Sequence, residues 1–171
     1  MFEKLKRKSL RKSIDKHLEE RDVSQVNSVV KTVAFLVDES VFQDLESLYE
    51  FSNFLELQRK DVKVFTFQEV KKKMPSLRQN HINNKEFDWK GQIHNQNAAE
   101  FLETSFDVLI GYYKGNHDFL DAMVSRSNAK FKVGFSDADE RLYDLLIAVD
   151  VHKPNDFMAE LKKYLTVLNK L

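Results

Sequence analysis

The sequence predicts an α/β fold: a single Rossmann-like three-layer domain with a mostly parallel sheet of five or six strands, preceded by an N-terminal basic helix. Three observations support this prediction. The chain has 171 residues, a length that suits one domain. Segments such as 32–37 and 106–111 are nearly continuously apolar, as strands covered on both faces are. These segments alternate with stretches whose apolar residues recur at helical spacing, the pattern of a parallel sheet with crossover helices.

Residues 1–31 are predicted to form the basic helix and a connector, and residues 32–171 the Rossmann-like domain. The segment Phe2–Glu20 is rich in Lys, Glu and Leu and contains neither Gly nor Pro, so it favours a helix. Its apolar face is narrow. Residues 1–21 hold eight basic and four acidic residues, a charge of +4 that the rest of this neutral chain balances with −4. Such asymmetry indicates a charged partner for this segment.

A strand–helix–strand unit follows the connector. Thr32–Val37 is predicted as a strand, Val41–Arg59 as a helix and Asp61–Phe67 as the next strand. Ser40 with Gln43 three residues later is a capping-box pattern, which would satisfy free amides at the start of the helix. The crossover between the two parallel strands should be right-handed.

The rest of the chain continues the alternation after an irregular stretch. Residues 69–86 are predicted as a loop or short helix that contains Pro75. The later predicted elements are a short strand at 87–89 ending at Gly91, a helix at 97–104 capped by Asn97, strands at 106–111, 130–135 and 145–149, a helix at 116–126 capped by Asn116, and a last helix from Pro154.

Candidate ligand-binding residues follow from this topology. Open parallel sheets bind ligands outside the carboxyl ends of their strands, near the point where strand order reverses. The polar residues expected at that crevice are Asp38, Glu39, Lys114, Asn116, His117 and Asp137. Each of them also fits an ordinary solvated loop, and no residue is assigned a catalytic role.

Several site classes lack their motifs. The absence of Cys excludes disulfide scaffolds, thiolate zinc sites and a cysteine nucleophile. The four glycines form neither GxGxxG nor GxxxxGK[ST], and neither HExxH nor GxSxG occurs. No cofactor and no metal are therefore expected. The loop from Gly111 to Asn116 is a weak candidate for anion binding at a helix start, and a plain strand-to-helix turn fits it better.

The basic helix leaves three alternatives open. Its candidate polyanion-binding residues are Lys4, Lys6, Arg7, Lys8, Arg11 and Lys12. The helix either docks on the domain through Leu10, Ile14 and Leu18, binds an anionic membrane surface, or binds RNA. Its removal is expected to leave the core folded. With no export signal and no apolar run long enough to span a bilayer, the protein is expected in the cytoplasm, or peripheral at the membrane if the helix binds lipid.

Four segments carry a family resemblance: VAFLVDES, FDWKGQI, AKFKVGF and YDLLIAVD. With the N-terminal basic helix, they resemble an uncharacterised family of short bacterial α/β proteins, a likeness that covers nearly the whole chain and implies no activity. Phe106–Phe135 is similar to the acceptor-side half of lipopolysaccharide heptosyltransferases, which implies the same fold. Asp38, Glu39 and Ser40 replace the Gly-Asp turn of that family, and the chain has no room for its sugar-nucleotide domain. This resemblance argues against the transferase reaction.

These observations predict a cytoplasmic binding or adaptor domain without catalytic activity, whose partner is a polyanion or another protein. The alternative is an enzyme, related to glycosyltransferases, that acts on a sugar or phosphorylated metabolite. Its site would be the crevice lined by Asp38, Lys114, Asn116 and His117.

Overall fold

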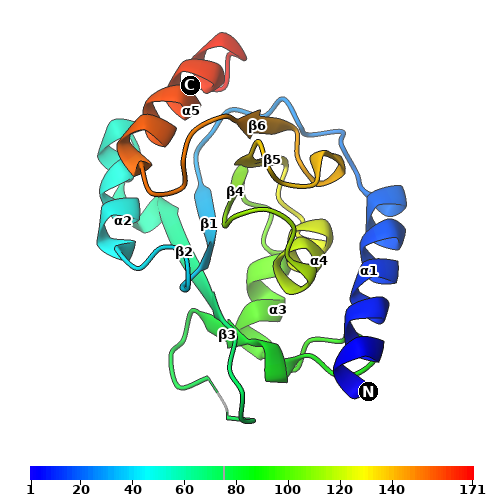
Figure 1. Ribbon diagram of the computed structural model, residues 1–171. Coiled ribbons are helices and arrows are strands. Elements are labelled where there is room, and N and C mark those ends of the chain that lie inside the picture. Colours follow the sequence, from blue (N-terminus) through cyan, green and yellow to red (C-terminus); the bar gives the residue numbers. More distant parts are fainter. Residues whose placement is uncertain (75) are drawn as a thin grey trace.

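Six parallel strands form one sheet in the computed structural model, which describes residues 1–74 and 76–171. The strand order is β3-β2-β1-β4-β5-β6, and every neighbouring pair is parallel. This arrangement confirms the predicted α/β fold with a parallel sheet (Figure 1). The strands are β1 Val33–Asp38, β2 Val62–Gln68, β3 His81–Asn83, β4 Val108–Tyr112, β5 Phe131–Phe135 and β6 Leu145–Ile147.

Helices cover both faces of the sheet. In Figure 1, α2 and α5 lie on one side, α3 and α4 on the other, and α1 lies on the outer side of α4. The α-helices are α1 Phe2–Glu20, α2 Leu45–Phe54, α3 Gln96–Glu103, α4 Asp118–Arg126 and α5 Pro154–Val167. Three short 3₁₀ helices accompany them, namely η1 Arg59–Asp61, η2 Asn84–Glu86 and η3 Glu140–Leu142.

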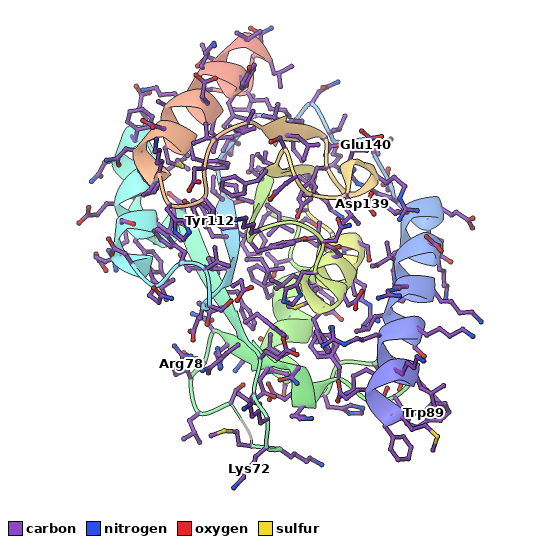
Figure 2. The ribbon with its side chains drawn as sticks, in the orientation of Figure 1. Lys72, Arg78, Trp89, Tyr112, Asp139 and Glu140 are labelled. Atoms are coloured by element: carbon purple, nitrogen blue, oxygen red, sulfur yellow. The ribbon has the colours of Figure 1, made fainter. Side chains whose placement is uncertain are left out.

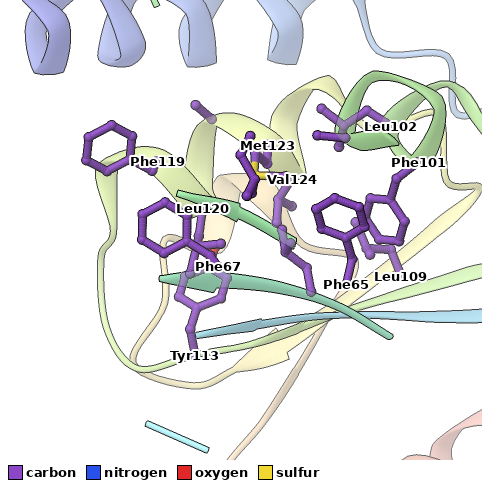
Figure 3. Close-up of a cluster of buried hydrophobic side chains, with 14 of the residues drawn as sticks. Phe65, Phe67, Phe101, Leu102, Leu109, Tyr113, Phe119, Leu120, Met123 and Val124 are labelled. Atoms are coloured by element: carbon purple, nitrogen blue, oxygen red, sulfur yellow. The ribbon is translucent and has the colours of Figure 1, made fainter. Parts of the chain in front are cut away.

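Two hydrophobic cores lie on the two faces of the sheet. Because side chains alternate along a strand, Phe35 joins the core under α2 and α5, whereas its neighbour Leu36 joins the core under α3 and α4. Figure 3 shows the second core, where the Phe65 and Phe101 rings stack with their centroids 4.8 Å apart. Burial on both faces explains why the strands are almost continuously apolar.

The N-terminal helix takes part in the second core. Leu10 is completely buried and Ile14 nearly so, and both belong to the cluster that contains the buried face of α4. Of the three alternatives for this helix, docking on the domain is therefore present in the structure. This packing speaks against the expectation that residues 1–21 can be removed without loss, because their removal would expose apolar surface of α4.

Helix α2 is shorter at both ends than the predicted Val41–Arg59. Its cap is Asp44, whose carboxylate accepts the backbone N–H three residues later, and not Ser40. The hydroxyl and the N–H of Ser40 instead donate to Asp38, which holds the chain in a turn after β1. At the other end, the left-handed conformation of Glu56, with φ 60°, stops the helix.

The irregular stretch 69–86 contains β3, a strand that the sequence did not predict. β3 pairs with β2, and its Ile82 joins the hydrophobic core. The polar His81 and Asn83 are buried because they find partners: Asn83 Nδ2 donates to the Met74 carbonyl at 2.9 Å. The strand predicted at 87–89 is wrong, since Phe87 forms only an isolated antiparallel bridge with Ile93. Pro75, expected in the loop, lies outside the described residues.

Two further helix caps differ from the predictions. Asn95, rather than Asn97, accepts a backbone N–H at the start of α3, and His117, rather than Asn116, does so for α4. In both cases the side chain that caps is the one whose backbone is extended just before the first helical residue, a position that spacing in the sequence defines only to within one or two residues.

Candidate functional site

A hollow of about 410 Å³ lies at the carboxyl ends of β1 and β2, beside the place where the strand order reverses between β1 and β4. It brings together three of the predicted crevice residues, Asp38, Glu39 and His117. Asp38 Oδ2 and His117 Nε2 are 3.8 Å apart across it. The lining residues are Asp38, Glu39, Ser40, Gln43, Phe67, Gln68, Glu69 and His117.

His117 is fixed by its role as a helix cap. Its Nδ1 accepts the N–H of Leu120 at 3.2 Å, so the proton of the neutral ring resides on Nε2, which faces Asp38. The ring packs edge-on against Phe67 with centroids 5.0 Å apart. Burial lowers the pKa of His117, and the charge of Asp38 only partly offsets that effect. A neutral imidazole with one N–H toward the hollow is the result.

Asp38 does not activate Ser40 as a nucleophile. Asp38 Oδ1 accepts both the N–H and the hydroxyl of Ser40, at 2.9 and 2.7 Å. The order of contacts is therefore Ser–Asp–His, with the carboxylate in the middle, whereas acyl transfer requires the imidazole next to the hydroxyl. These contacts stabilise the turn after β1.

Glu39 belongs to a second charge cluster at the same edge. Its Oε1 lies 2.7 Å from Arg78 Nη1 and 3.8 Å from Nδ1 of the buried His81. Burial works to raise the pKa of Glu39, but the Arg78 guanidinium and the Thr66 hydroxyl outweigh it and hold that pKa below its usual value. Glu39 thus stays ionised and ties the loop before β3 to the end of β1.

A buried polar network lies behind His117, and the sequence reading missed it. Asp121 accepts the Tyr113 hydroxyl at 2.6 Å and the His117 N–H at 3.1 Å, and Tyr143 donates to Tyr113 at 2.7 Å. Burial raises the pKa of Asp121 to about 6. Gly111 is a sequence feature that could have indicated this network, because a glycine inside a strand marks a close approach. A Cβ at this position would overlap the Tyr143 hydroxyl.

A buried lysine on β5 was also missed. Lys132 is 1% exposed, and its Nζ donates to the carbonyl of Val124 near the end of α4 at 2.6 Å. Burial lowers the pKa of Lys132 to about 7. With no access to solvent, its role is to satisfy a carbonyl at the helix terminus.

The remaining crevice candidates lie apart from the first hollow. Lys114 and Asp137 line a second, smaller hollow of about 140 Å³ with residues that follow β5 and β6. Asn116 is exposed and lines neither hollow. At the helix start after Gly115, the N–H groups of His117 and Leu120 are already bound by the side chains of Asp121 and His117, which leaves fewer free amides for an anion.

The part of the chain that the structure describes holds no group of three or more His, Asp or Glu side chains arranged for a metal ion. Over the same residues, no helix has both the length and the apolar character needed to cross a bilayer.

Half of the predicted polyanion-binding residues contact other parts of the chain. Lys6 is buried and donates to the carbonyl of Asn84 at 3.2 Å. Arg7 and Arg11 both bind the Asp118 carboxylate, at 3.2 and 3.0 Å. The other three, Lys4, Lys8 and Lys12, are exposed and form no ion pair within residues 1–74 and 76–171.

A larger groove, of about 850 Å³, lies between the start of α1 and the segments 73–74 and 85–94. Phe2, Met74 and Trp89 line it and are 70%, 51% and 54% exposed. Figure 2 shows Trp89 beside the first turn of α1. Because the sequence predicted a strand at 87–89, it gave no indication of this groove. The other lining residues are Lys6, Lys73, Lys85, Glu86, Phe87, Asp88 and His94.

A family model described as "Family of unknown function (DUF6913)" matches residues 6–168. The chain belongs to this family. The match confirms the expected membership of a family of unknown function over nearly the whole chain. No curated protein and no solved structure matches the chain, so the likeness to heptosyltransferases stays an expectation. The part of this DUF6913 domain covered by the match includes α1 from Lys6 onward together with the whole sheet.

Proposed function

We propose that this DUF6913 protein is a non-catalytic binding domain that attaches to a negatively charged partner through the exposed face of α1. One observation carries the proposal. Lys4, Lys8 and Lys12 follow each other at four-residue spacing, are all exposed, and lack acidic partners among the described residues. Like charges at this spacing repel one another and weaken a helix. A partner with negative charge relieves that repulsion.

The docking of α1 on the domain fixes the direction in which Lys4, Lys8 and Lys12 face. Because Lys6, Arg7 and Arg11 point to partners on the domain, the helix is held with its remaining lysines outward. The cations are thus presented by a fixed surface and not by a loose tail. Attachment in the cytoplasm, where anionic lipids and RNA are both available, fits this arrangement.

The contacts within the crevice also support a non-catalytic role. Its carboxylates have contacts within the molecule: Asp38 accepts from Ser40, Glu39 pairs with Arg78, and Glu69 pairs with Arg7. A reaction needs a nucleophile, acid or base that is free to meet the substrate. Among the described residues that line the hollow, the Nε2–H of His117 and Asp38 Oδ2 face each other at 3.8 Å, and neither lies beside a nucleophile that it could activate.

The test uses the full chain with two probes, phosphatidylserine-containing vesicles and polyuridylate, over a range of salt concentrations. Binding to at least one probe is expected, falling as salt rises. Lys8→Glu/Lys12→Glu should weaken it at least about tenfold, since each cation near an anionic surface contributes about 1 kcal/mol. The matched control is Lys31→Glu/Lys60→Glu, the same charge change before β1 and β2. No binding to either probe, or an equal loss in the control, would overturn the proposal.

An enzyme acting on a sugar or phosphorylated metabolite is the second candidate, and the neutral His117 beside the 410 Å³ hollow favours it. The carboxylates of Asp38, Glu39 and Glu69 around the hollow oppose a phosphate and suit sugar hydroxyls better. Ligand-detected NMR against a panel of free sugars tests it. Binding that disappears in His117→Asn, which keeps a capping side chain, would support this candidate, and no binding would remove it.

A further inference from the structure

Exposed apolar side chains gather at the end of the molecule where α1 begins. Phe2, Met74 and Trp89 line the 850 Å³ groove there, and Leu5, 45% exposed, follows Phe2 on the first turn of α1. Isolated exposed apolar residues are common, but several around one groove mark an interaction surface. We refer to Phe2, Leu5, Met74 and Trp89 as the apolar rim.

The rim is mounted on a fixed platform. The buried Lys6 joins the start of α1 to η2 through the carbonyl of Asn84, and Lys85 reaches back to Glu3 Oε1 at 3.4 Å. These contacts hold the first turns of α1 against the segment that carries Trp89. A segment whose backbone is already held in place loses less entropy when it enters a partner.

The acidic residues of the groove are used within their own loop. Glu86 accepts the Ser76 hydroxyl at 2.7 Å and the Asn83 N–H at 2.9 Å. Asp88 lies 2.9 Å from His94 Nε2 and accepts the N–H of Lys90 at 2.9 Å. The charges left to face a partner are positive. They belong to Lys73 in the lining of the groove and to Lys4, Lys8, Lys71, Lys72 and Lys90 in the flanking segments, all exposed.

The composition of the rim favours lipid over RNA. Single-stranded RNA binds by stacking bases on open aromatic faces, and here Lys90 Nζ lies over the Trp89 ring, 5.1 Å from its centroid. Leu5 and Met74 offer no ring to stack on. A Trp with neighbouring lysines and aliphatic side chains is instead the combination found at membrane–water interfaces.

We propose that the partner surface is an anionic lipid bilayer, that the apolar rim enters its interface, and that the surrounding lysines hold the headgroups. This inference rests on the proposed function and names its partner. Few apolar side chains take part, so attachment is reversible and depends on both charge and insertion.

The protein carries its own probe, because Trp89 is its only Trp. The full chain is mixed with vesicles of phosphatidylcholine and phosphatidylserine, and Trp89 emission is recorded. A blue shift and protection from an aqueous quencher are expected. Vesicles of phosphatidylcholine alone and polyuridylate should produce neither effect, because the first lacks charge and the second lacks an apolar phase.

Variants separate the two contributions. Lys72→Glu/Lys73→Glu should weaken vesicle binding at least about tenfold, whereas Lys31→Glu/Lys60→Glu, with the same charge change, should leave it within about twofold. Phe2→Ser/Leu5→Ser keeps Trp89 and should reduce binding even at low salt.

The outcomes are distinguishable. Binding to polyuridylate without vesicle binding would overturn the lipid inference and leave the proposed function standing. Vesicle binding with unchanged Trp89 emission would also overturn it, because the rim would then be outside the contact. Binding to neither probe would overturn both proposals.

Discussion

Two regions of this molecule use charge in opposite ways. At the carboxyl ends of β1 and β4, acidic and basic side chains meet each other, as Asp118 meets Arg7 and Arg11. At the groove beside the start of α1, the acids serve their own loop, Lys6 and Lys85 have partners, and Lys73 with the flanking lysines faces solvent. The first arrangement fixes the positions of segments. The second leaves positive charges exposed to solvent. Charged residues at a topological switch point can therefore be taken up by contacts within the molecule.

The largest expected effect on stability comes from comparing the buried face of α1 with its exposed face. Leu10→Ala removes a fully buried side chain between α1 and α4 and should lower the free energy of unfolding by about 3 kcal/mol. Phe2→Ala on the same helix should change it by less than about 0.5 kcal/mol, because Phe2 is 70% exposed. Urea unfolding measures both. Equal effects would show that α1 does not pack this way in solution.

The next effect tests whether the network behind the crevice is structural. Gly111→Ala places a Cβ against the Tyr143 hydroxyl and should cost about 2 kcal/mol. Because the two sites touch, combining it with Tyr143→Phe should cost less than the sum of the single changes. Gly115→Asn is the matched control: its surroundings are open, and Asn tolerates the left-handed backbone there. Additive costs at 111 and 143 would contradict the contact.

The pH dependence of stability tests the same buried network through Asp121. Burial raises its pKa from 3.8 to about 6, so between those values the folded state binds more protons than the unfolded state. Its contribution to the free energy of unfolding therefore falls as pH rises from about 4 to about 6, by on the order of 2 kcal/mol. Urea unfolding over this range checks it. Asp121→Asn should remove that part of the slope, and an unchanged slope would reject the assignment to this residue.

The smallest effect belongs to the lysines of the groove. Lys72→Glu/Lys73→Glu should change the free energy of unfolding by less than about 0.5 kcal/mol, because both side chains are exposed and form no ion pair among the described residues. Thermal unfolding measures this. A large destabilisation would show that these lysines serve the fold, and the contrast between the two regions would fail.

Local sequence patterns predicted most of the fold and only part of the candidate site. Five of the six strands and all five α-helices were predictable, because periodicity and continuous apolar runs are properties of a single segment. β3 was not, since its polar side chains are buried only through partners such as Met74 and Thr66. Within the crevice, the sequence predicted that Asp38, Glu39 and His117 lie together, and it assigned Lys114 and Asp137 to the same place, although they line a separate hollow.

The sequence by itself determined the parallel α/β architecture, the basic helix and the edge of the sheet where polar loops gather, because these depend on the order of residues along one segment or one strand end. Only the tertiary structure decided which charges are free. Whether Arg7 finds Asp118, or whether Phe2 and Trp89 frame one groove, depends on residues that are far apart in the chain and meet only when α1 packs on α4 and η2. Pairing engages one set of cations and leaves the other exposed, and the proposed partner surface rests on that difference.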